Sequence, residues 1–173
     1  MDSTAAFDDA GLFARLDELG IACETHAHAP LFTVEQSRAL RGDLPGAHIK
    51  NLFLRDKKRR MWLVTVLESR DIDLKALRRR IGAKGTLSFG DPALLMAHLG
   101  VVPGAVTPFA VINDRAGAVT MVLDKALQAG TVVNAHPLRN DRTSAIGADD
   151  LLRFLEAEGH SPLIVDFDSK VED

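Results

Sequence analysis

Apolar and polar side chains alternate along the chain in a way that predicts short helices and strands in mixed order. Residues 10–20 have apolar side chains at helical spacing and end in Gly20, a residue suited to follow a helix. Residues 21–28 predict a short strand. Thr33 followed by Gln36 is a capping-box pattern that predicts a helix over 33–40.

Residues 48–55, HIKNLFLR, follow a loop over 41–47 and predict a strand with large apolar groups on both faces. Lys50 stands at its polar end. Because an unpaired buried ammonium costs several kcal/mol, we expect Lys50 to reach water, a carboxylate or an anionic ligand.

A second strand over 61–67 follows the polar run RDKKRR, so the two strands predict a β-hairpin with basic residues near its tip. Residues 73–82 predict a helix whose polar side is almost wholly cationic. Residues 90–100 predict another helix, with Asp91 as N-cap and Pro92 in its first turn.

The last third of the chain continues this mixture. The stretch 103–114 leads into a strand, and 113–117 predicts a turn. Further strands are expected over 118–124, 130–137 and 161–167, and an amphipathic helix over 147–160. Hairpins mixed with helices predict a single compact domain of the α+β or mixed α/β class.

Composition limits the class of protein and the cellular compartment that fit this domain. A chain of 173 residues is long enough to bury a sizeable core. One cysteine excludes an intramolecular disulfide and fits a reducing compartment. The acidic first residues lack the features of a signal peptide, and no apolar run is long enough to cross a bilayer. We therefore expect a cytoplasmic protein that does not insert into membranes.

Familiar catalytic motifs are absent: the sequence has no G-x-S-x-G elbow, P-loop or Rossmann glycine fingerprint. Cys23, among apolar neighbours, suits a small core residue better than a nucleophile. His26 and His28 have a spacing that can chelate a metal, but no C-x-x-C or H-E-x-x-H pattern supports a metal site. No cofactor is expected.

Three places remain as candidates for chemistry. Lys50 is the first. The second is Gly104–Pro108, GAVTP, where glycine and proline fix a loop whose amides can face an oxygen-rich group. The third is Asn134–His136, which offers an amide and an imidazole at the end of a strand. Each also has an ordinary structural interpretation, and none is diagnostic alone.

Taken together, these places carry a resemblance. The stretches FTVEQS, HIKNLFLRDKK, 61–114 and 132–155 resemble the YbaK/prolyl-tRNA-synthetase-associated editing family. The chain looks most like its free-standing ProX-type prolyl-tRNA deacylases, over about residues 7–167 of one editing domain spanning 1–173. The resemblance implies a mixed α/β fold with a curved central mixed sheet flanked by helices. It also implies hydrolysis of the ester of mischarged tRNA(Pro), with Ala-tRNA(Pro) as the favoured substrate.

The resemblance also assigns roles to residues. The family's strand lysine, G-x-x-x-P loop and late histidine correspond to the catalytic candidates Lys50, Gly104 and His136. The expected substrate-binding residues are Asn51, Val106, Thr107, Pro108, Phe109 and Asn134. A small pocket near Leu44–Ile49 and Val106–Phe109 would admit alanine and exclude the proline ring.

The net charge of −3 does not indicate a nucleic-acid binder, but the basic residues are clustered. The expected contacts to acceptor-stem phosphates are Lys57, Lys58, Arg59, Arg60, Arg78, Arg79, Arg80 and Lys84. The expected partner is the acceptor end of tRNA(Pro), while prolyl-tRNA synthetase or an elongation factor stays open as a further partner. Alternatives are a Cys-tRNA(Pro) deacylase, a non-catalytic tRNA-binding module and a metal-dependent hydrolase using His26 and His28.

Overall fold

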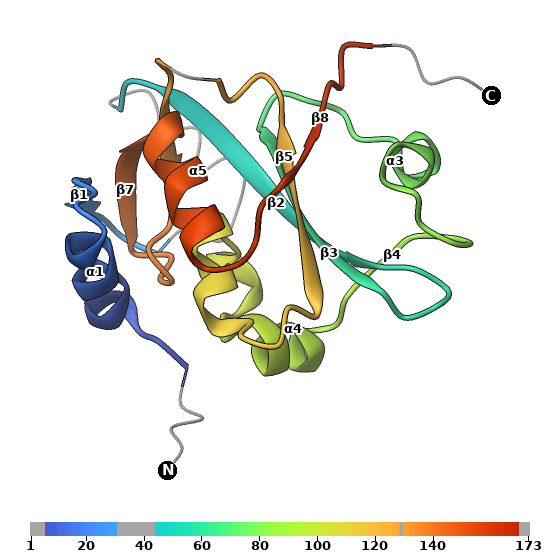
Figure 1. Ribbon diagram of the computed structural model, residues 1–173, viewed down its shortest axis with the longest axis horizontal. Coiled ribbons are helices and arrows are strands. Elements are labelled where there is room, and N and C mark those ends of the chain that lie inside the picture. The colour runs from blue at the N-terminus through green and yellow to red at the C-terminus, as the bar shows by residue number, and fades with distance from the viewer. Residues whose placement is uncertain (1–5, 31–43, 129, 170–173) are drawn as a thin grey trace.

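A mixed sheet forms the centre of the computed structural model, which describes residues 6–30, 44–128 and 130–169 (Figure 1). Within these residues the sheet has eight strands in the order β1-β7-β6-β2-β3-β5-β8, with β4 paired to β2. The strands are β1 Glu24–Ala27, β2 Ala47–Arg55, β3 Met61–Leu67, β4 Ser88–Phe89, β5 Val119–Asp124, β6 Val132–Ala135, β7 Arg142–Gly147 and β8 Leu163–Val165.

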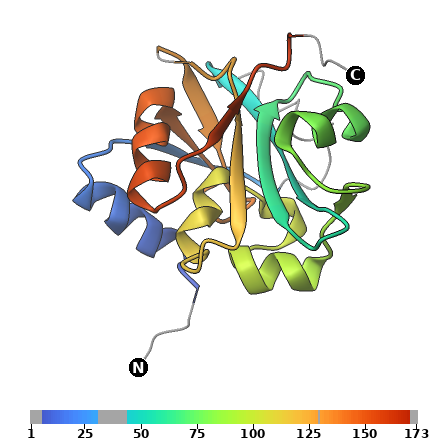
Figure 2. The same ribbon diagram turned by 45° about the vertical axis from the view of Figure 1, so that its right-hand side comes forward.

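Short helices connect the strands and cover the sheet. They are α1 Asp9–Glu18, α3 Leu74–Ile81, α4 Pro92–Leu99, α5 Ala148–Ala157 and the 3-10 helices η1 Pro103–Ala105 and η2 Pro108–Asn113. Helices α5 and α3 lie on either side of β8 in two views of the molecule (Figure 1, Figure 2). The expected mixed α/β architecture is confirmed.

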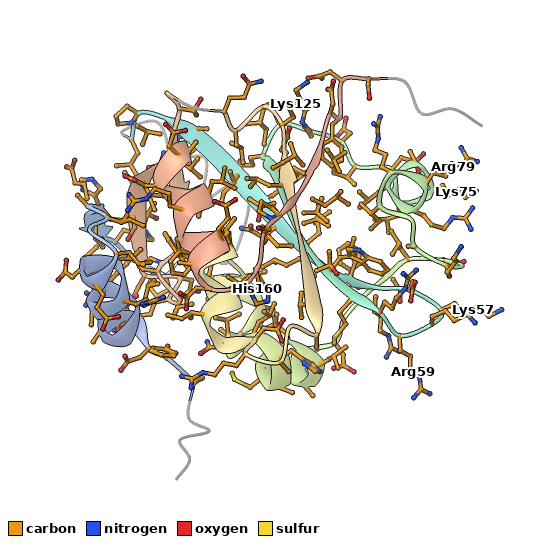
Figure 3. All side chains as sticks on the ribbon, viewed as in Figure 1. Lys57, Arg59, Lys75, Arg79, Lys125 and His160 are labelled. Atoms are coloured by element: carbon orange, nitrogen blue, oxygen red, sulfur yellow. The ribbon has the colours of Figure 1, made fainter. Side chains whose placement is uncertain are left out.

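The hairpin expected from the sequence is formed by β2 and β3, which pair antiparallel from Ile49 opposite Leu67 to Arg55 opposite Met61. Its tip carries the basic run, and the Lys57 and Arg59 side chains extend away from the sheet (Figure 3). Strand β2 also pairs with β6 in parallel and with β4, so it lies inside the sheet.

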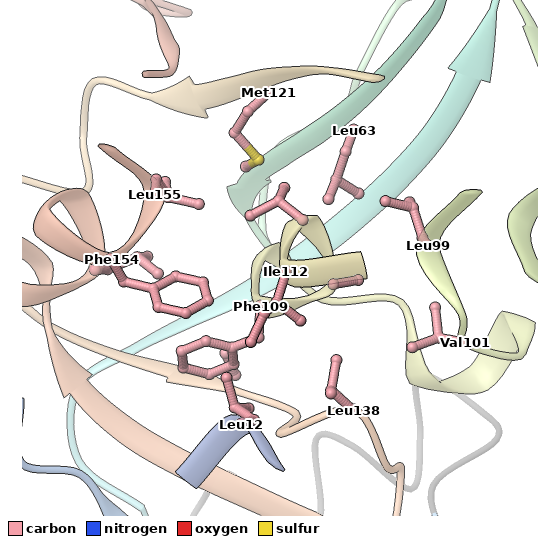
Figure 4. Packing of buried hydrophobic residues seen from close by; sticks show 14 of the residues in the cluster. Leu12, Leu63, Leu99, Val101, Phe109, Ile112, Met121, Leu138, Phe154 and Leu155 are labelled. Carbon is pink, nitrogen blue, oxygen red and sulfur yellow. The ribbon is translucent and has the colours of Figure 1, made fainter. Parts of the chain in front are cut away.

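Both faces of the hairpin are buried, as the sequence predicts for residues 48–55. Odd-numbered Phe53 and Leu63 join the larger core. In this core the rings of Phe109 and Phe154 pack edge to face, with their centroids 5.5 Å apart (Figure 4). Even-numbered Leu54, Trp62 and Val64 join a second core with Leu77 of α3. Alternation along each strand therefore separates two hydrophobic clusters.

Capping residues fix the helix boundaries. Asp73 and Asp91 accept backbone N–H groups at the starts of α3 and α4, and Asp8 does the same for α1. Gly82 and Gly100 follow α3 and α4 with φ of 72° and 66°, the left-handed conformation in which glycine carries no Cβ penalty. The predictions of Asp91 as N-cap, of Pro92 in the first turn and of Gly100 at the end of the helix over 90–100 are confirmed.

Two segments differ from the sequence-based expectation. The strand expected directly after the Gly104–Pro108 loop is a helix instead. Residues 108–113 form the buried helix η2, with Pro108 in its first turn. A short apolar run cannot be assigned to strand or helix from periodicity alone when all its sides are buried. Strand β7, Arg142–Gly147, is not indicated by the sequence because its polar residues lack an alternating pattern. The helix expected over 33–40 lies outside the described residues.

Candidate functional site

Lys50 occupies the even-numbered face of β2, and its ammonium donates a hydrogen bond to the main-chain carbonyl of Arg70. The side chain is half-buried. The sequence predicts water, a carboxylate or an anionic ligand as the partner of Lys50. The partner that the structure shows is a neutral carbonyl, which is none of these. An ammonium has three N–H donors, and this contact uses one of them.

Asn51 points from the opposite face of β2 and joins the strand to the glycine–proline loop. Its Nδ2 donates to the carbonyl of Val106 at 3.1 Å, and its Oδ1 accepts from the Thr65 hydroxyl at 2.6 Å. Thr65 is fully buried and lies directly opposite Asn51 in the β2–β3 ladder. The orientation of the Asn51 amide is thereby fixed, and with it the distance between β2 and the loop.

The Gly104–Pro108 loop contains η1 and then turns into η2. Gly104 and Val106 are half-buried, whereas Thr107, Pro108 and Phe109 are buried. The Thr107 hydroxyl accepts the Phe109 N–H at 3.4 Å and caps η2. The side chains of these three buried residues thus anchor the loop, while Gly104 and Val106 form its more accessible part.

Asn134 braces the chain where it enters β2. Its Nδ2 donates to the carbonyls of Pro45 at 2.9 Å and Ala47 at 3.2 Å. Between them, Gly46 has φ of +103°, and an added Cβ would lie 2.8 Å from the Val132 carbonyl oxygen. This segment therefore requires both glycine and the Asn134 amide.

His136 follows β6, and its Nδ1 donates to the carbonyl of Arg142 at 2.8 Å. Burial lowers the pKa of His136 from its ordinary value of 6.5. A neutral ring that donates through Nδ1 has Nε2 as an acceptor. His28 lies alongside, with ring centroids 6.2 Å apart, and its own ring nitrogens contact the Ala29 carbonyl and the Thr143 hydroxyl.

Lys50 and His136 approach the same end of the short parallel ladder between β2 and β6. The ladder ends with His48 opposite Asn134. Lys50 and His136 each lie two residues further along; for Lys50, which is still within β2, a step of two residues preserves the face. Lys50 and Asn134 therefore lie on one face of the sheet at this ladder end, His136 lies just beyond the end of β6, and Asn51 connects the Gly104 loop to the other face.

Some of the expected tRNA-binding residues form contacts within the protein, and others extend toward solvent. Arg60 contacts Asp56 at 3.1 Å and donates to the Gly82 carbonyl, and Arg80 donates to the carbonyls of Asp166 and Ser169. Lys57 and Arg59 extend outward from the hairpin tip, and Arg79 extends outward from α3 (Figure 3). Lys58 and Lys84 are exposed and Arg78 is half-buried.

The remaining candidates for chemistry have structural surroundings. Burial raises the pKa of the Cys23 thiol to about 11, so its thiolate form is disfavoured. His26 lies 3.4 Å from Glu24. Within residues 6–30, 44–128 and 130–169, no group of three or more His, Cys, Asp or Glu is arranged to hold a metal ion. None of the helices in these ranges is long and apolar enough to span a membrane.

The sequence does not indicate two residues that support Lys50. Arg70 supplies the carbonyl acceptor, and Asp124 binds the Arg70 guanidinium through both carboxylate oxygens. Nothing in the local pattern around either residue indicates this pairing, since they are 54 residues apart.

Comparison with known proteins agrees with this architecture. The model of the aminoacyl-tRNA editing domain matches residues 28–154. The chain is 42% identical to the Bos taurus prolyl-tRNA synthetase associated domain-containing protein 1, covering 92% of this chain and 95% of the relative. It is 36% identical to the prolyl-tRNA editing protein ProX of Acetoanaerobium sticklandii, covering 87% and 92%.

Solved structures share the fold. A candidate trans-editing enzyme for prolyl tRNA synthetase superposes with a TM-score of 0.67 at 18% identity, covering 94% of this chain and 98% of that chain. At this level of identity the match concerns the fold alone.

Proposed function

Because the chain belongs to the aminoacyl-tRNA editing domain family, we propose that it is a trans-editing deacylase that hydrolyses mischarged tRNA(Pro), with Ala-tRNA(Pro) as its main substrate. Its similarity to a ProX protein favours this choice over other tRNAs. The protein would act in the cytoplasm after the synthetase has released its product. Prolyl-tRNA synthetase or an elongation factor would be a further partner.

The observation that carries the proposal is the arrangement around the β2–β6 ladder end. A cation, a neutral imidazole and a glycine-containing loop fixed by Asn51 are held by separate strands of one sheet. Because Lys50 and the loop are on opposite faces of the sheet, the charged 3′ end would bind past the end of the ladder, where the ammonium would meet its phosphate or ribose and the loop amides its ester carbonyl.

The chemistry proposed is direct attack by water. An aminoacyl-tRNA is an activated ester with a neighbouring ribose hydroxyl, so it needs no protein nucleophile. Water attacks the ester carbonyl, the tetrahedral intermediate collapses, and the amino acid leaves as the ribose hydroxyl regains a proton. Removing one preorganised donor to such an intermediate typically lowers the rate by about 10²–10³-fold.

Individual residues receive roles in this scheme. The Lys50 ammonium binds the terminal phosphate or ribose region as a point charge. Main-chain N–H groups at Gly104 bind the ester carbonyl, where a larger residue would crowd it. His136 Nε2, left as an acceptor, orients the water or the ribose hydroxyl.

Selectivity would follow from size. A synthetase site built for proline discriminates poorly against alanine, because a missing methylene changes binding by only about 1–3 kcal/mol. A second pocket near Leu44–Ile49 and Val106–Phe109 would admit alanine and clash with the proline ring. The Asn51–Val106 hydrogen bond would then fix one wall of this pocket.

The hairpin tip suits the acceptor stem. The five steps along the strand from Lys50 to Arg55 span about 17 Å, at roughly 3.3 Å per residue, so the basic tip begins well beyond the reacting ester. Acceptor-stem phosphates continue from the charged 3′ end and would meet Lys57, Lys58 and Arg59. RNA duplexes are bound largely through backbone and shape.

The test is deacylation of Ala-tRNA(Pro), Cys-tRNA(Pro) and Pro-tRNA(Pro), each with and without a chelator. We expect release of alanine that is independent of the chelator, with little release of proline. Faster release of cysteine would indicate that Cys-tRNA(Pro) is the main substrate. Loss of activity with chelator would indicate a metal enzyme. Binding without hydrolysis of any substrate would identify a tRNA-binding module instead.

Lys50→Ala tests the assigned centre in the same assay. We expect kcat/KM to fall by about 10²-fold, since a preorganised charged donor is removed. Lys125→Ala is a matched control, because Lys125 is an exposed lysine just after β5 whose ammonium lies 4.0 Å from Asp166. If Lys50→Ala stays within a few-fold of the wild type, the assignment of Lys50 is wrong.

A further inference from the structure

The turn that follows β3 carries the carbonyl that accepts the Lys50 hydrogen bond. Arg70 N–H donates to the Leu67 carbonyl at 3.1 Å and closes the turn, and Glu68 N–H donates to the His48 carbonyl at 2.9 Å. The turn is therefore attached directly to the part of β2 that precedes Lys50. Its position determines where the Arg70 carbonyl lies.

The Arg70 side chain fixes this turn to two other parts of the chain. Its guanidinium, only 15% exposed, makes two hydrogen bonds to Asp124 at the end of β5. It makes two more to Asp168 beyond β8, at 2.9 and 3.1 Å. The planar guanidinium can serve two carboxylates at once, which a lysine ammonium cannot do with the same geometry.

Asp124 holds the turn as well as the arginine. The carboxylate is fully buried and accepts the Leu67 N–H at 3.1 Å and the Ala126 N–H at 2.9 Å. Both of its oxygens are thus occupied by donors from the turn, from Arg70 and from its own strand end. Hydrogen bonds to Asp168 and Asp124 also raise the pKa of Arg70, so the guanidinium stays charged.

This arrangement affects the charge that Lys50 presents. The two carboxylates that contact Arg70 are paired with its guanidinium, and Lys50 is held by a neutral carbonyl. A carbonyl restrains the flexible lysine stem without cancelling its positive charge. A carboxylate in the same place would compete with an incoming phosphate.

We propose that Arg70, clamped between Asp124 and Asp168, is a positioning residue that holds the Lys50 ammonium for substrate through its main-chain carbonyl. The inference deepens the proposed function and rests on it for its catalytic meaning. It also makes the segment after β8 part of the site, although Asp168 is 98 residues from Arg70 in the sequence.

Arg70→Lys and Asp168→Asn test this inference. Arg70→Lys keeps a positive charge but cannot span both carboxylates, and Asp168→Asn changes an exposed side chain and leaves the hydrophobic core intact. Glu18→Gln is the matched control, because Glu18 forms an exposed ion pair with Arg15 on α1. Circular dichroism and thermal unfolding verify that each variant is folded.

The first readout is hydrogen exchange of the Lys50 ammonium with water, measured by nitrogen-15 NMR and assigned with Lys50→Arg. We expect exchange to become about fivefold faster in Arg70→Lys and to increase less in Asp168→Asn, with Lys57 and the Glu18→Gln control unchanged. An unchanged Lys50 rate in Arg70→Lys overturns the inference. This readout needs no catalysis, so it tests the role of Arg70 even if the proposed function is wrong.

The second readout is single-turnover deacylation in a double-mutant cycle. Arg70→Lys is expected to lower kcat/KM about tenfold in the wild-type background, because the ammonium is misplaced, and to have no further effect on Lys50→Ala. Equal decreases in both backgrounds would show that Arg70 acts independently of Lys50 and would overturn the inference. Failure of wild-type protein to hydrolyse any mischarged tRNA would refute the proposed function alone.

Discussion

The side-chain amide of Asn51 donates a hydrogen bond to the main-chain carbonyl of Val106, 3.1 Å away and 55 residues later in the chain. This contact joins the central strand to the glycine–proline loop. Because Thr65 holds the other side of the same amide, the geometry depends on a buried pair rather than on loop sequence alone.

Replacing Asn51 is expected to loosen this loop. Asn51→Asp places an oxygen against the Val106 carbonyl, so we expect a stability loss of about 1–3 kcal/mol and a fall in kcat/KM of about tenfold or more. Urea unfolding and Ala-tRNA(Pro) deacylation measure the two effects.

Asn113→Ala is the control for Asn51→Asp. The Asn113 amide also donates to a main-chain carbonyl, that of Leu99, at 3.0 Å, but on the α4 side of η2. It is expected to lose stability with little change in activity. If Asn51→Asp behaves in the same way, the Asn51 bond serves only the fold.

His136 is expected to make stability depend on pH. Its folded-state pKa is lowered by burial, so the unfolded chain binds a proton near pH 6.5 while the folded protein resists it. Stability should therefore be retained above pH 6.5 and decrease as the pH falls through the lowered pKa. Proton NMR of the ring and urea unfolding from pH 8 to pH 5 measure this.

The comparison for His136 is His136→Gln, which cannot titrate. We expect its stability to decrease less than that of the wild type over the same range of pH. A ring that titrates at or above its ordinary value of 6.5 would contradict the burial argument.

Cys23 is expected to be unreactive in the folded protein. A pKa of about 11 against an ordinary 9.0 leaves roughly a hundredfold less thiolate at neutral pH. A disulfide reagent at pH 8 should react slowly until denaturant is added, and Cys23→Ala should retain deacylation. Rapid labelling of the native protein, or inactivation by Cys23→Ala, would refute this.

The hairpin tip should contribute to tRNA affinity through its outward-facing lysines. Lys57→Ala combined with Lys58→Ala is expected to weaken binding and to reduce the dependence of log K on log salt by about 0.7–0.9 for each phosphate that the variant no longer neutralises. Filter binding or anisotropy from low to moderate salt measures the slope.

Arg60→Ala separates charge from structure at the same tip. Arg60 contacts the buried Asp56 carboxylate and stacks over Trp62 at 5.2 Å. Its removal should lower the unfolding temperature while leaving the salt slope closer to that of the wild type. A slope reduced as far as in the double lysine variant would assign Arg60 to the RNA surface.

Local sequence is sufficient to predict those elements whose cause is local. Asp73 and Gly82 define the ends of α3 because a cap accepts N–H groups a few residues away and a glycine adopts positive φ at no steric cost. The β2–β3 hairpin follows from alternating apolar residues around a short polar run. The order of the motifs along the chain also indicates the family.

Which polar groups meet depends on the tertiary structure. The partner of Lys50 is the carbonyl of a residue 20 positions away, which is itself held by carboxylates 54 and 98 positions away. Buried polar groups must find partners wherever the chain brings them, so local periodicity carries no record of these pairs. The folding of the sheet determines them, by bringing β2, β5 and the segment after β8 to one place.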